Sequence, residues 1–257
     1  MTSQPGRDRQ PDREVDWDAQ GDRYAQTRHH VTQTAPYEPL VVDAVATVAP
    51  GPVVDVGAGT GIWSAVLARW TRRDVVAVEP APGMRRHAAA ASVPGVRHVA
   101  ARVPHLPLRT GSCAGAWLSA VLHHTGDLGA CARELRRVLV PGAPVLIRGA
   151  FAGRLENLPP AHYFPEVRRR FDRYPSVEAT EAAFGEAGFR RRRFETVEEH
   201  TIDLAEWRRL LPDQRRSDTA LVQLTDDEFA AGLRRVDADI AAGRTRPRTA
   251  LDLLVLA

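Results

Sequence analysis

The stretch VVDVGAGTGI at residues 53–62 decides the fold. Its mostly apolar start has the length of a short buried strand, and it runs directly into glycines at positions 57, 59 and 61. Glycine lets the backbone turn tightly and lets a ligand approach without a clash against Cβ. The G-x-G-x-G spacing differs from the dinucleotide fingerprint G-x-G-x-x-G, in which the third glycine comes one residue later. The stretch therefore predicts a strand, a ligand-binding glycine loop and the start of a helix.

A second strand that ends in an acid strengthens this interpretation. Val75–Val78 is apolar and is followed directly by Glu79 and Pro80. A carboxylate at this distance beyond the first glycine can accept hydrogen bonds from both hydroxyls of a ribose. The alternative is that Glu79 is an ordinary acid of a surface turn. Its pairing with the glycine loop favours the ribose site.

Strand and helix patterns alternate along the chain from residue 37 onward, which predicts a mostly parallel α/β sheet. Two stretches, 151–175 and 203–246, do not fit the alternation. We expect them above the carboxyl ends of the strands, where ligands bind in open α/β sheets. Thr225 and Glu228 predict a capping box for a helix over 226–242. The predicted strands are 53–56, 75–78, 96–100, 116–121, 145–147, 192–200 and 251–256.

Composition places the chain among ordinary globular proteins. Its 257 residues suit one large α/β domain with a lid, or two small domains, and the net charge is only +3. Every basic residue other than histidine is arginine, which is typical of a GC-rich genome such as that of an actinomycete. The arginine runs at 168–170 and 190–193 are interpreted as solvated charge. The stacking aromatics of an RNA-binding module are absent, so no nucleic-acid partner is expected.

The sequence also predicts where the protein works. No apolar run is long enough to cross a bilayer, and the polar start of the chain lacks the apolar segment of a signal peptide. Cys113 and Cys131 form no metal-binding pattern and are predicted to be small core residues. We therefore expect a cytoplasmic protein without a metal site or a membrane partner, either monomeric or homodimeric.

Four segments together resemble class I S-adenosylmethionine-dependent methyltransferases of the small-molecule, Methyltransferase-11-like type. They are residues 55–61, Glu79, AWLSAVLHH at 116–124 and RELRRVLVPG at 133–142. The resemblance covers about Tyr24 to Ala257. It implies a Rossmann-like sheet of seven strands in the order 3-2-1-4-5-7-6, with strand 7 antiparallel, helices on both faces and a helical lid. It also implies S-adenosylmethionine as the cofactor and S-adenosylhomocysteine as the product.

The resemblance implies a role for each matching position. The glycine loop lines the methionine moiety, Asp55 orients the loop or the ammonium group, and Glu79 holds the ribose. Pro80 and Met84 flank the adenine, the backbone of Ser119 lies near the methionine amine, and an N-terminal tyrosine–arginine pair closes over the cofactor. The cofactor-binding residues implied in this way are Tyr24, Arg28, Asp55, Gly57, Ala58, Gly59, Gly61, Glu79, Pro80, Met84, Arg102, Val103 and Ser119.

Three positions depart from the family pattern. Arg102 stands where the family commonly has an acid that accepts a hydrogen bond from the adenine amine. Arginine only donates hydrogen bonds, but it can stack on the adenine ring while the backbone of Val103 reads the base edge. Ala114 and Ala143 stand where an aspartate and a glycine are usual. We expect cofactor binding to survive but to be weakened or rearranged.

Methyl transfer from a sulfonium needs alignment and exclusion of water, and it needs a general base only when the acceptor is protonated. His123 or His124, just past the fourth strand, is the best candidate for that base, with His123 preferred, and the weaker candidates are His29, His30 and Tyr37. A loop histidine that packs or caps is the alternative. The acceptor pocket is expected to come from the insertions, where aromatic residues either contact the ligand or form lid core. The pocket candidates are Tyr37, His124, Tyr163, Phe164 and Trp207, with Phe171 and Tyr174 as further aromatics.

The sequence thus predicts a methyltransferase that acts on a small, hydrophobic or aromatic molecule of specialised metabolism. The alternatives are an enzyme of this fold that does not methylate, such as a cyclase, and a non-enzymatic binding protein. The expected organisation is an N-terminal start and cap helix (1–36), a cofactor-binding core (37–150), a lid insertion (151–175), the continued core (176–202), a helical lid insertion (203–246) and the last core strand (247–257).

Overall fold

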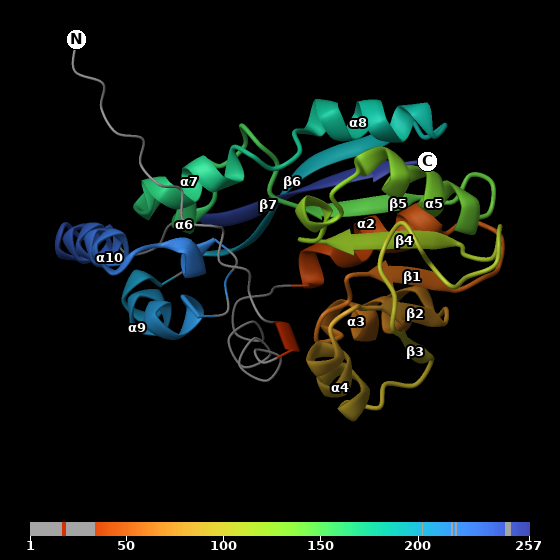
Figure 1. The fold of residues 1–257 in the computed structure, drawn as a ribbon, viewed down its shortest axis with the longest axis horizontal. Coiled ribbons are helices and arrows are strands. Elements are labelled where there is room, and N and C mark those ends of the chain that lie inside the picture. The colour runs from red at the N-terminus through yellow and green to blue at the C-terminus, as the bar shows by residue number, and fades with distance from the viewer. Residues whose placement is uncertain (1–16, 19–33, 202, 217, 219, 245–247) are drawn as a thin grey trace, which may run out of the picture.

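The computed structural model describes residues 17–18, 34–201, 203–216, 218, 220–244 and 248–257 of the chain (Figure 1). Tyr24 and Arg28, the residues expected to close over the cofactor, lie outside the described residues. His29 and His30 lie outside them as well.

The described chain forms one seven-stranded sheet in the order β3-β2-β1-β4-β5-β7-β6. Strands β1 to β5 pair in parallel with their neighbours, and β7 lies antiparallel between β5 and β6. The predicted Rossmann-like sheet is therefore confirmed in both order and direction. The strands are β1 (Val53–Val56), β2 (Val75–Val78), β3 (Val96–Val99), β4 (Gly115–Ser119), β5 (Val145–Gly149), β6 (Arg191–Thr201) and β7 (Arg248–Leu256).

The two strands that lead into the glycine loop and into Glu79 are buried at every position. Parallel strands covered on both faces need such near-continuous apolar sequence. Val53 of β1 pairs with Val75 of β2, and Val56 pairs with Val78. Since Gly57 and Glu79 follow these strands directly, the register places the loop and the acid beside each other.

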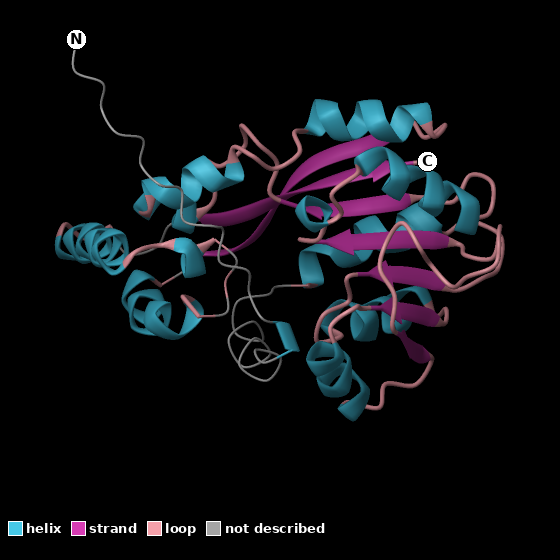
Figure 2. Cartoon of the chain, viewed as in Figure 1, coloured by secondary structure: helices cyan, strands magenta, loops and turns pink. Residues whose placement is uncertain are grey.

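Helices cover both faces of the sheet (Figure 2). On one face, α2 (Glu38–Val45) and α3 (Ile62–Thr71) pack around Trp117 of β4. On the other face, α5 (Leu128–Val138) and α8 (Val177–Glu186) pack around Leu118. Ser176 caps α8, because its Oγ accepts a hydrogen bond from Ala179 N at 3.1 Å. The remaining elements of the core are α4 (Pro82–Ala90), η1 (Ala35–Tyr37) and η2 (Leu122–His124).

The two insertions gather at one end of the sheet (Figure 1). One follows β5 and the other connects β6 to β7, so both lie at the carboxyl ends of the parallel strands. Their buried side chains form a cluster of their own, separate from the two clusters that line the sheet. We call these elements the lid: α6 (Pro159–Tyr163), α7 (Pro165–Phe171), α9 (Leu204–Gln214), η3 (Leu221–Gln223) and α10 (Asp226–Ala241).

Several local predictions are confirmed. Thr225 and Glu228 form the expected capping box at the start of α10. Cys113 and Cys131 are both free thiols buried in the core. Burial raises the pKa of the Cys131 thiol to about 12, so this thiol stays protonated. None of the described helices is both long and apolar enough to cross a bilayer.

Candidate functional site

The glycine loop curls over the end of β2. The backbone N–H groups of Gly57 and Ala58 both donate to the carbonyl oxygen of Val78, at 2.8 and 3.0 Å. Gly57, Gly59 and Gly61 have φ values of 69, 55 and 82°, in the left-handed region where only glycine is free of strain. A Cβ on residue 57 would collide with the Val121 side chain, whereas a Cβ on residue 59 would meet nothing within 4 Å. The loop is therefore packed against protein at Gly57 and open at Gly59.

Glu79 is tied to this loop. Its buried carboxylate accepts hydrogen bonds from Gly59 N through Oε2 and from Ala81 N through Oε1, both at 2.9 Å. One carboxylate thus fixes the glycine loop and the chain that enters α4. Each carboxylate oxygen has more than one lone pair, so the group can still accept from a ribose hydroxyl. The predicted partnership of loop and acid is present in the structure.

Asp55 lies beneath the loop and is only 1 % exposed. Ser64 Oγ, from the first turn of α3, donates to Asp55 Oδ2 at 2.6 Å. The pKa of Asp55 is raised to about 7, chiefly by burial; the hydrogen bond from Ser64 opposes the rise, and the nearby charge of Glu79 adds to it. Sequence reasoning identified Asp55 but missed Ser64. A hydroxyl in the helix that follows the glycines was the available signal.

The predicted adenine side is built from the ends of β2 and β3. Met84 is buried in α4, and Val103 belongs to the core, whereas Arg102 is exposed. The segment after Val103 is fastened to α5, because Glu134 Oε1 accepts from Leu106 N at 2.7 Å and Arg137 donates to the Leu106 and Leu108 carbonyls. The stacking role proposed for Arg102 stays a prediction.

A short N-terminal segment reaches across this region. Asp18 Oδ1 accepts a hydrogen bond from Gly83 N in α4 at 2.7 Å. The Trp17 ring lies edge-on to His124, with centroids 6.3 Å apart. Since α4 follows β2, η2 follows β4 and β1 lies between those strands, these two residues span the ends that flank the glycine loop. Sequence reasoning expected an N-terminal cap but did not single out Trp17 or Asp18.

Strand β4 ends earlier than predicted. Its last residue is Ser119, because Ala120 adopts a left-handed φ of 52° that ends the extended backbone. Such a φ in a residue other than glycine costs about 1–3 kcal/mol and is concentrated at functional sites. The turn sends Val121 toward Gly57 and starts η2 with Leu122. The end of β4 is thus bent over the glycine loop.

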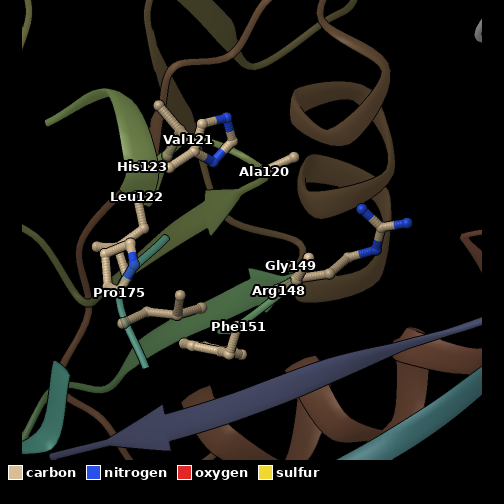
Figure 3. A pocket seen from close by; sticks show the side chains of 10 residues that line it. Ala120, Val121, Leu122, His123, Arg148, Gly149, Phe151 and Pro175 are labelled. Atoms are coloured by element: carbon tan, nitrogen blue, oxygen red, sulfur yellow. The ribbon is translucent and has the colours of Figure 1, made fainter. Parts of the chain in front are cut away.

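His123 and the segment around it line a small pocket beside this bend (Figure 3). Val121 and Leu122 contribute from the same segment, and Phe151 and Pro175 lie opposite. The His123 ring stacks on Tyr174 at 4.0 Å and lies 4.0 Å from the His124 ring. Burial lowers the pKa of His123 to about 3, with smaller contributions from His124 and Arg170. His123 is therefore neutral near pH 7.

The part of the chain that forms this site was compared with models of known protein families. Residues 54–147 match the family model described as a methyltransferase domain. The chain carries a methyltransferase-family domain. The match spans the glycine loop, Glu79, β4 and α5, and it ends within β5. No curated protein sequence matches the chain significantly.

Solved structures share the overall fold of the chain. An Anabaena variabilis protein assigned as a methyltransferase of an antibiotic biosynthesis pathway is 21 % identical, with a TM-score of 0.69, and the match covers 90 % of this chain and 99 % of that one. The [4+2]-cyclase SpnF is 17 % identical with a TM-score of 0.53, covering 85 % and 78 %. A geranyl diphosphate C-methyltransferase of Streptomyces coelicolor is 14 % identical with a TM-score of 0.54, covering 86 % and 78 %. At these identities the likeness shows the fold.

The residues of the methyltransferase domain fit S-adenosylmethionine as the cofactor. Gly59 leaves its side of the loop open to a ligand, and the Glu79 carboxylate lies next to it where a ribose needs an acceptor. Pro80 is exposed at the start of the turn into α4. Ala114 and Ala143 are both fully buried, so a larger polar group at either position would need a partner in the core.

A buried cluster of charged and polar side chains connects β4, β5 and β6. The Arg148 guanidinium of β5 donates to Glu199 of β6 through Nε at 2.9 Å and through Nη2, and to Ser119 Oγ at 3.0 Å. Tyr37 Oη donates to the same Glu199 oxygen at 2.8 Å. The guanidinium also lies over the Trp63 ring at 4.9 Å. We call these residues the Arg148 cluster. Sequence reasoning missed it, although an arginine in the apolar strand VLIRG was a signal.

The aromatic residues proposed for the acceptor pocket are packed into protein. Tyr37 is fully buried, and its hydroxyl is held by Glu199. Tyr163 donates to Asp239 Oδ2 at 2.9 Å, and Trp207 Nε1 donates to Gln214 at 3.0 Å. Phe164 stacks on a neighbouring phenylalanine within the lid and is fully buried. The structure thus uses these side chains as core, and their contact with a ligand stays a prediction. His124 is exposed beside His123.

Proposed function

We propose that the protein is an S-adenosylmethionine-dependent methyltransferase that acts on a small, hydrophobic or aromatic molecule of specialised metabolism. The observation that carries the proposal is the bond from Gly59 N to the buried Glu79 carboxylate, inside the segment that matches the methyltransferase domain. This contact joins the methionine and ribose sides of a cofactor site at the carboxyl ends of β1 and β2.

The proposed cofactor site uses residues of the core, residues 37–150. The glycine loop holds the methionine moiety, Glu79 accepts from the ribose, and Met84 and Val103 form the adenine side. Asp55, raised in pKa by burial, binds the cofactor ammonium in its ionised form. Trp17 and Asp18 belong to an N-terminal cap over this site. The closure of Tyr24 and Arg28 over the cofactor stays a prediction from the sequence.

The lid insertions, 151–175 and 203–246, are proposed to cover the acceptor. Their own hydrophobic core makes them a rigid cover rather than a set of loops. The pocket beside His123 lies where β4 and β5 end, and Pro175 of the segment that leads into α8 also lines it. An acceptor held there would meet the methyl group at the end of β4, as alignment of the two reactants requires.

Cofactor binding is tested by calorimetry with S-adenosylhomocysteine. We expect saturable binding to the wild type, and we expect Glu79→Gln to weaken it at least tenfold because the amide replaces a charged acceptor. Glu186→Gln, at an exposed position of α8, is the matched control and should bind as the wild type does. Absence of binding to the wild type at millimolar ligand would overturn the proposal.

A second candidate function is an enzyme of this fold that does not methylate. Two observations favour it as the alternative: Arg102 replaces the usual adenine-binding acid, and the [4+2]-cyclase SpnF shares the fold over 85 % of this chain. Incubation with methyl-labelled cofactor and a metabolite extract separates the two. A labelled product supports methyl transfer, whereas a new product without label supports the alternative.

A further inference from the structure

Two side chains of α5 fasten the loop that follows β3. Glu134 and Arg137 lie one turn apart, and Arg137 donates to Glu134 through Nε and Nη2, at 2.8 and 2.7 Å. Glu134 Oε1 also accepts a hydrogen bond from Leu106 N at 2.7 Å. Arg137 donates to the carbonyl oxygens of Leu106 and Leu108, at 3.0 and 2.8 Å. We call Glu134 and Arg137 the loop clamp, because together they bind three backbone groups of one loop.

Both members of the loop clamp are charged and partly covered. The side chain of Glu134 is 12 % exposed and that of Arg137 is 37 % exposed. The hydrogen bonds from Arg137 and from Leu106 N lower the pKa of Glu134 against the opposing effect of burial, so the pair stays ionised near pH 7. Hydrogen bonds to ionised groups are stronger than neutral ones, and a planar guanidinium donates in fixed directions. The clamp therefore fixes the loop in both distance and direction.

The turn at residues 102–105 connects β3 to the clamped loop. His105 N closes it by donating to Arg102 O at 2.9 Å. Pro104 has no N–H group, and the N–H of Val103 has no acceptor among the described residues. The turn therefore keeps a backbone donor at Val103 that a ligand can use.

This turn lies beside the proposed ribose site. Strand β3 is the neighbour of β2, and Glu79 N, directly after β2, donates to Val99 O at the end of β3 at 3.1 Å. Within the turn, Val103 is only 7 % exposed and has an apolar side chain, whereas Arg102 and His105 are exposed. A base edge that is buried against this turn is therefore recognised by its backbone.

We propose that Glu134 and Arg137 are positioning residues that make the cofactor site selective for adenine. By holding the loop at Leu106 and Leu108, they fix the preceding turn so that Val103 N–H donates to an acceptor nitrogen on the edge of the base. This inference rests on the proposed function, because it needs the cofactor or its product at the ribose site. Neither side chain needs to contact the cofactor, since both act through the backbone of the loop.

Adenine and hypoxanthine present opposite hydrogen-bonding groups to such a donor. Adenine N1 carries no proton and accepts a hydrogen bond, whereas hypoxanthine carries a proton at N1. A hypoxanthine base would therefore place its own N–H against Val103 N–H and leave both donors unsatisfied, which a fixed turn cannot relieve. If the turn is released, Val103 N–H can rotate away from the base, and the preference for adenine becomes smaller.

The experiment measures the affinity of the full chain for S-adenosylhomocysteine and for S-inosylhomocysteine by calorimetry. These two ligands differ only in the base. We expect the wild type to bind S-adenosylhomocysteine at least about tenfold more tightly. A substitution that merely loosens the fold weakens both ligands alike, so the ratio of the two dissociation constants reports on recognition of the base.

Two variants open the loop clamp from either side. Glu134→Ala removes the acceptor for Leu106 N, and Arg137→Met removes both donors to the loop carbonyls while keeping most of the side-chain volume. Each variant should lower the ratio to about threefold or less. Arg133→Gln, at an exposed position of the same helix, is the control and should keep the wild-type ratio.

The result with the wild type separates this inference from the proposed function. If S-adenosylhomocysteine does not bind at all, the proposed function fails and the inference fails with it. If it binds but S-inosylhomocysteine binds as tightly, the turn does not select the base and the inference alone is overturned. A wild-type ratio in Glu134→Ala and Arg137→Met, or an equal fall in Arg133→Gln, would also overturn it.

Discussion

The cofactor side and the lid are built in different ways. On the cofactor side, the contacts join backbone groups close in sequence: Gly59 N meets a carboxylate only 20 residues away. In the lid, side chains far apart pack together: Tyr163 bonds to Asp239, which is 76 residues away, and Phe164 stacks on Phe229. Backbone turns demand glycines at fixed positions, whereas packing only demands volume. A sequence motif can therefore identify the methyl donor that binds at this site, but not the molecule that accepts the methyl group.

The largest effect is expected in the Arg148 cluster, which lies in the sheet that carries both regions. The Arg148 and Glu199 side chains are only 7 % and 3 % exposed. Arg148→Met leaves the Glu199 carboxylate buried without its partner, and breaking such a pair costs about 3–5 kcal/mol. The free energy of unfolding in urea measures this loss. The double variant Arg148→Met with Glu199→Gln should recover most of it, because the amide is neutral and can still accept from Tyr37.

A surface ion pair is the control for this prediction. Arg191 and Glu181 are 3.1 Å apart, with side chains 54 % and 29 % exposed. Arg191→Met should cost less than about 1 kcal/mol because solvent screens the pair. If Arg148→Met costs no more than Arg191→Met, the buried pair adds no more to stability than an exposed one.

The pH dependence of stability tests the buried acid beneath the glycine loop. Asp55 has a pKa of about 7 in the folded protein against 3.8 for the unperturbed group. The folded state therefore keeps a proton that the unfolded state has lost. The stability that Asp55 contributes is complete below about pH 4 and is lost as pH rises to about 7, by up to about 4 kcal/mol.

Asp55→Asn removes this titration but keeps an acceptor for Ser64. We expect the difference in free energy of unfolding between wild type and variant to fall steadily from pH 4 to pH 7 and to become constant above that range. A difference that does not change with pH would show that Asp55 is ionised throughout.

Gly57 and Gly59 sharpen the contrast within the loop itself. Both have left-handed φ values, so alanine adds strain of about 1–2 kcal/mol at either position. Only at residue 57 does the new Cβ collide with Val121, which adds about 1–3 kcal/mol of overpacking. In urea unfolding of the ligand-free protein, Gly57→Ala should therefore be about 2 kcal/mol less stable than Gly59→Ala. Equal losses of stability in the two variants would mean that Val121 can move away from the new Cβ because the bend after β4 is flexible.

Much of the fold could be predicted because it depends on local pattern. The boundaries of β1 and β2 are those expected from their apolar runs, and the cap at Thr225 was visible as a short motif. The end of β4 was misplaced because nothing in the sequence marks Ala120 for a left-handed φ; its surroundings impose that conformation.

The residues of the candidate site also fall into those that could be predicted from the sequence and those that could not. Asp55, the glycines and Glu79 were found because a bound cofactor needs them at fixed spacing. Arg148 and Glu199 were missed because their roles depend on which strands become neighbours: β5 and β6 are separated in the sheet by β7, the last strand of the chain. The aromatic residues of the lid were visible, but periodicity cannot tell a ligand contact from lid core.

Gly232 tests whether the lid packs as tightly as the loop. It lies within α10 with ordinary helical backbone, where alanine alone would gain about 0.5–1 kcal/mol. However, a Cβ at this position would collide with the ring of Phe164, which is fully buried and cannot swing away. We expect Gly232→Ala to cost about 1–3 kcal/mol and to speed hydrogen exchange in α9 and α10. Affinity for S-adenosylhomocysteine should not change, because the lid lies outside the cofactor site.

Gly185→Ala in α8 is the matched control. Its Cβ would come no closer than 3.7 Å to another atom, at the flexible end of Arg190, so this substitution should be neutral or slightly stabilising. If Gly232→Ala also leaves hydrogen exchange in the lid unchanged, the lid core is loose enough to absorb a methyl group. A lid of that kind would change shape to fit the acceptor. The lid would then be soft, whereas the site of the methyl donor is fixed by its backbone hydrogen bonds.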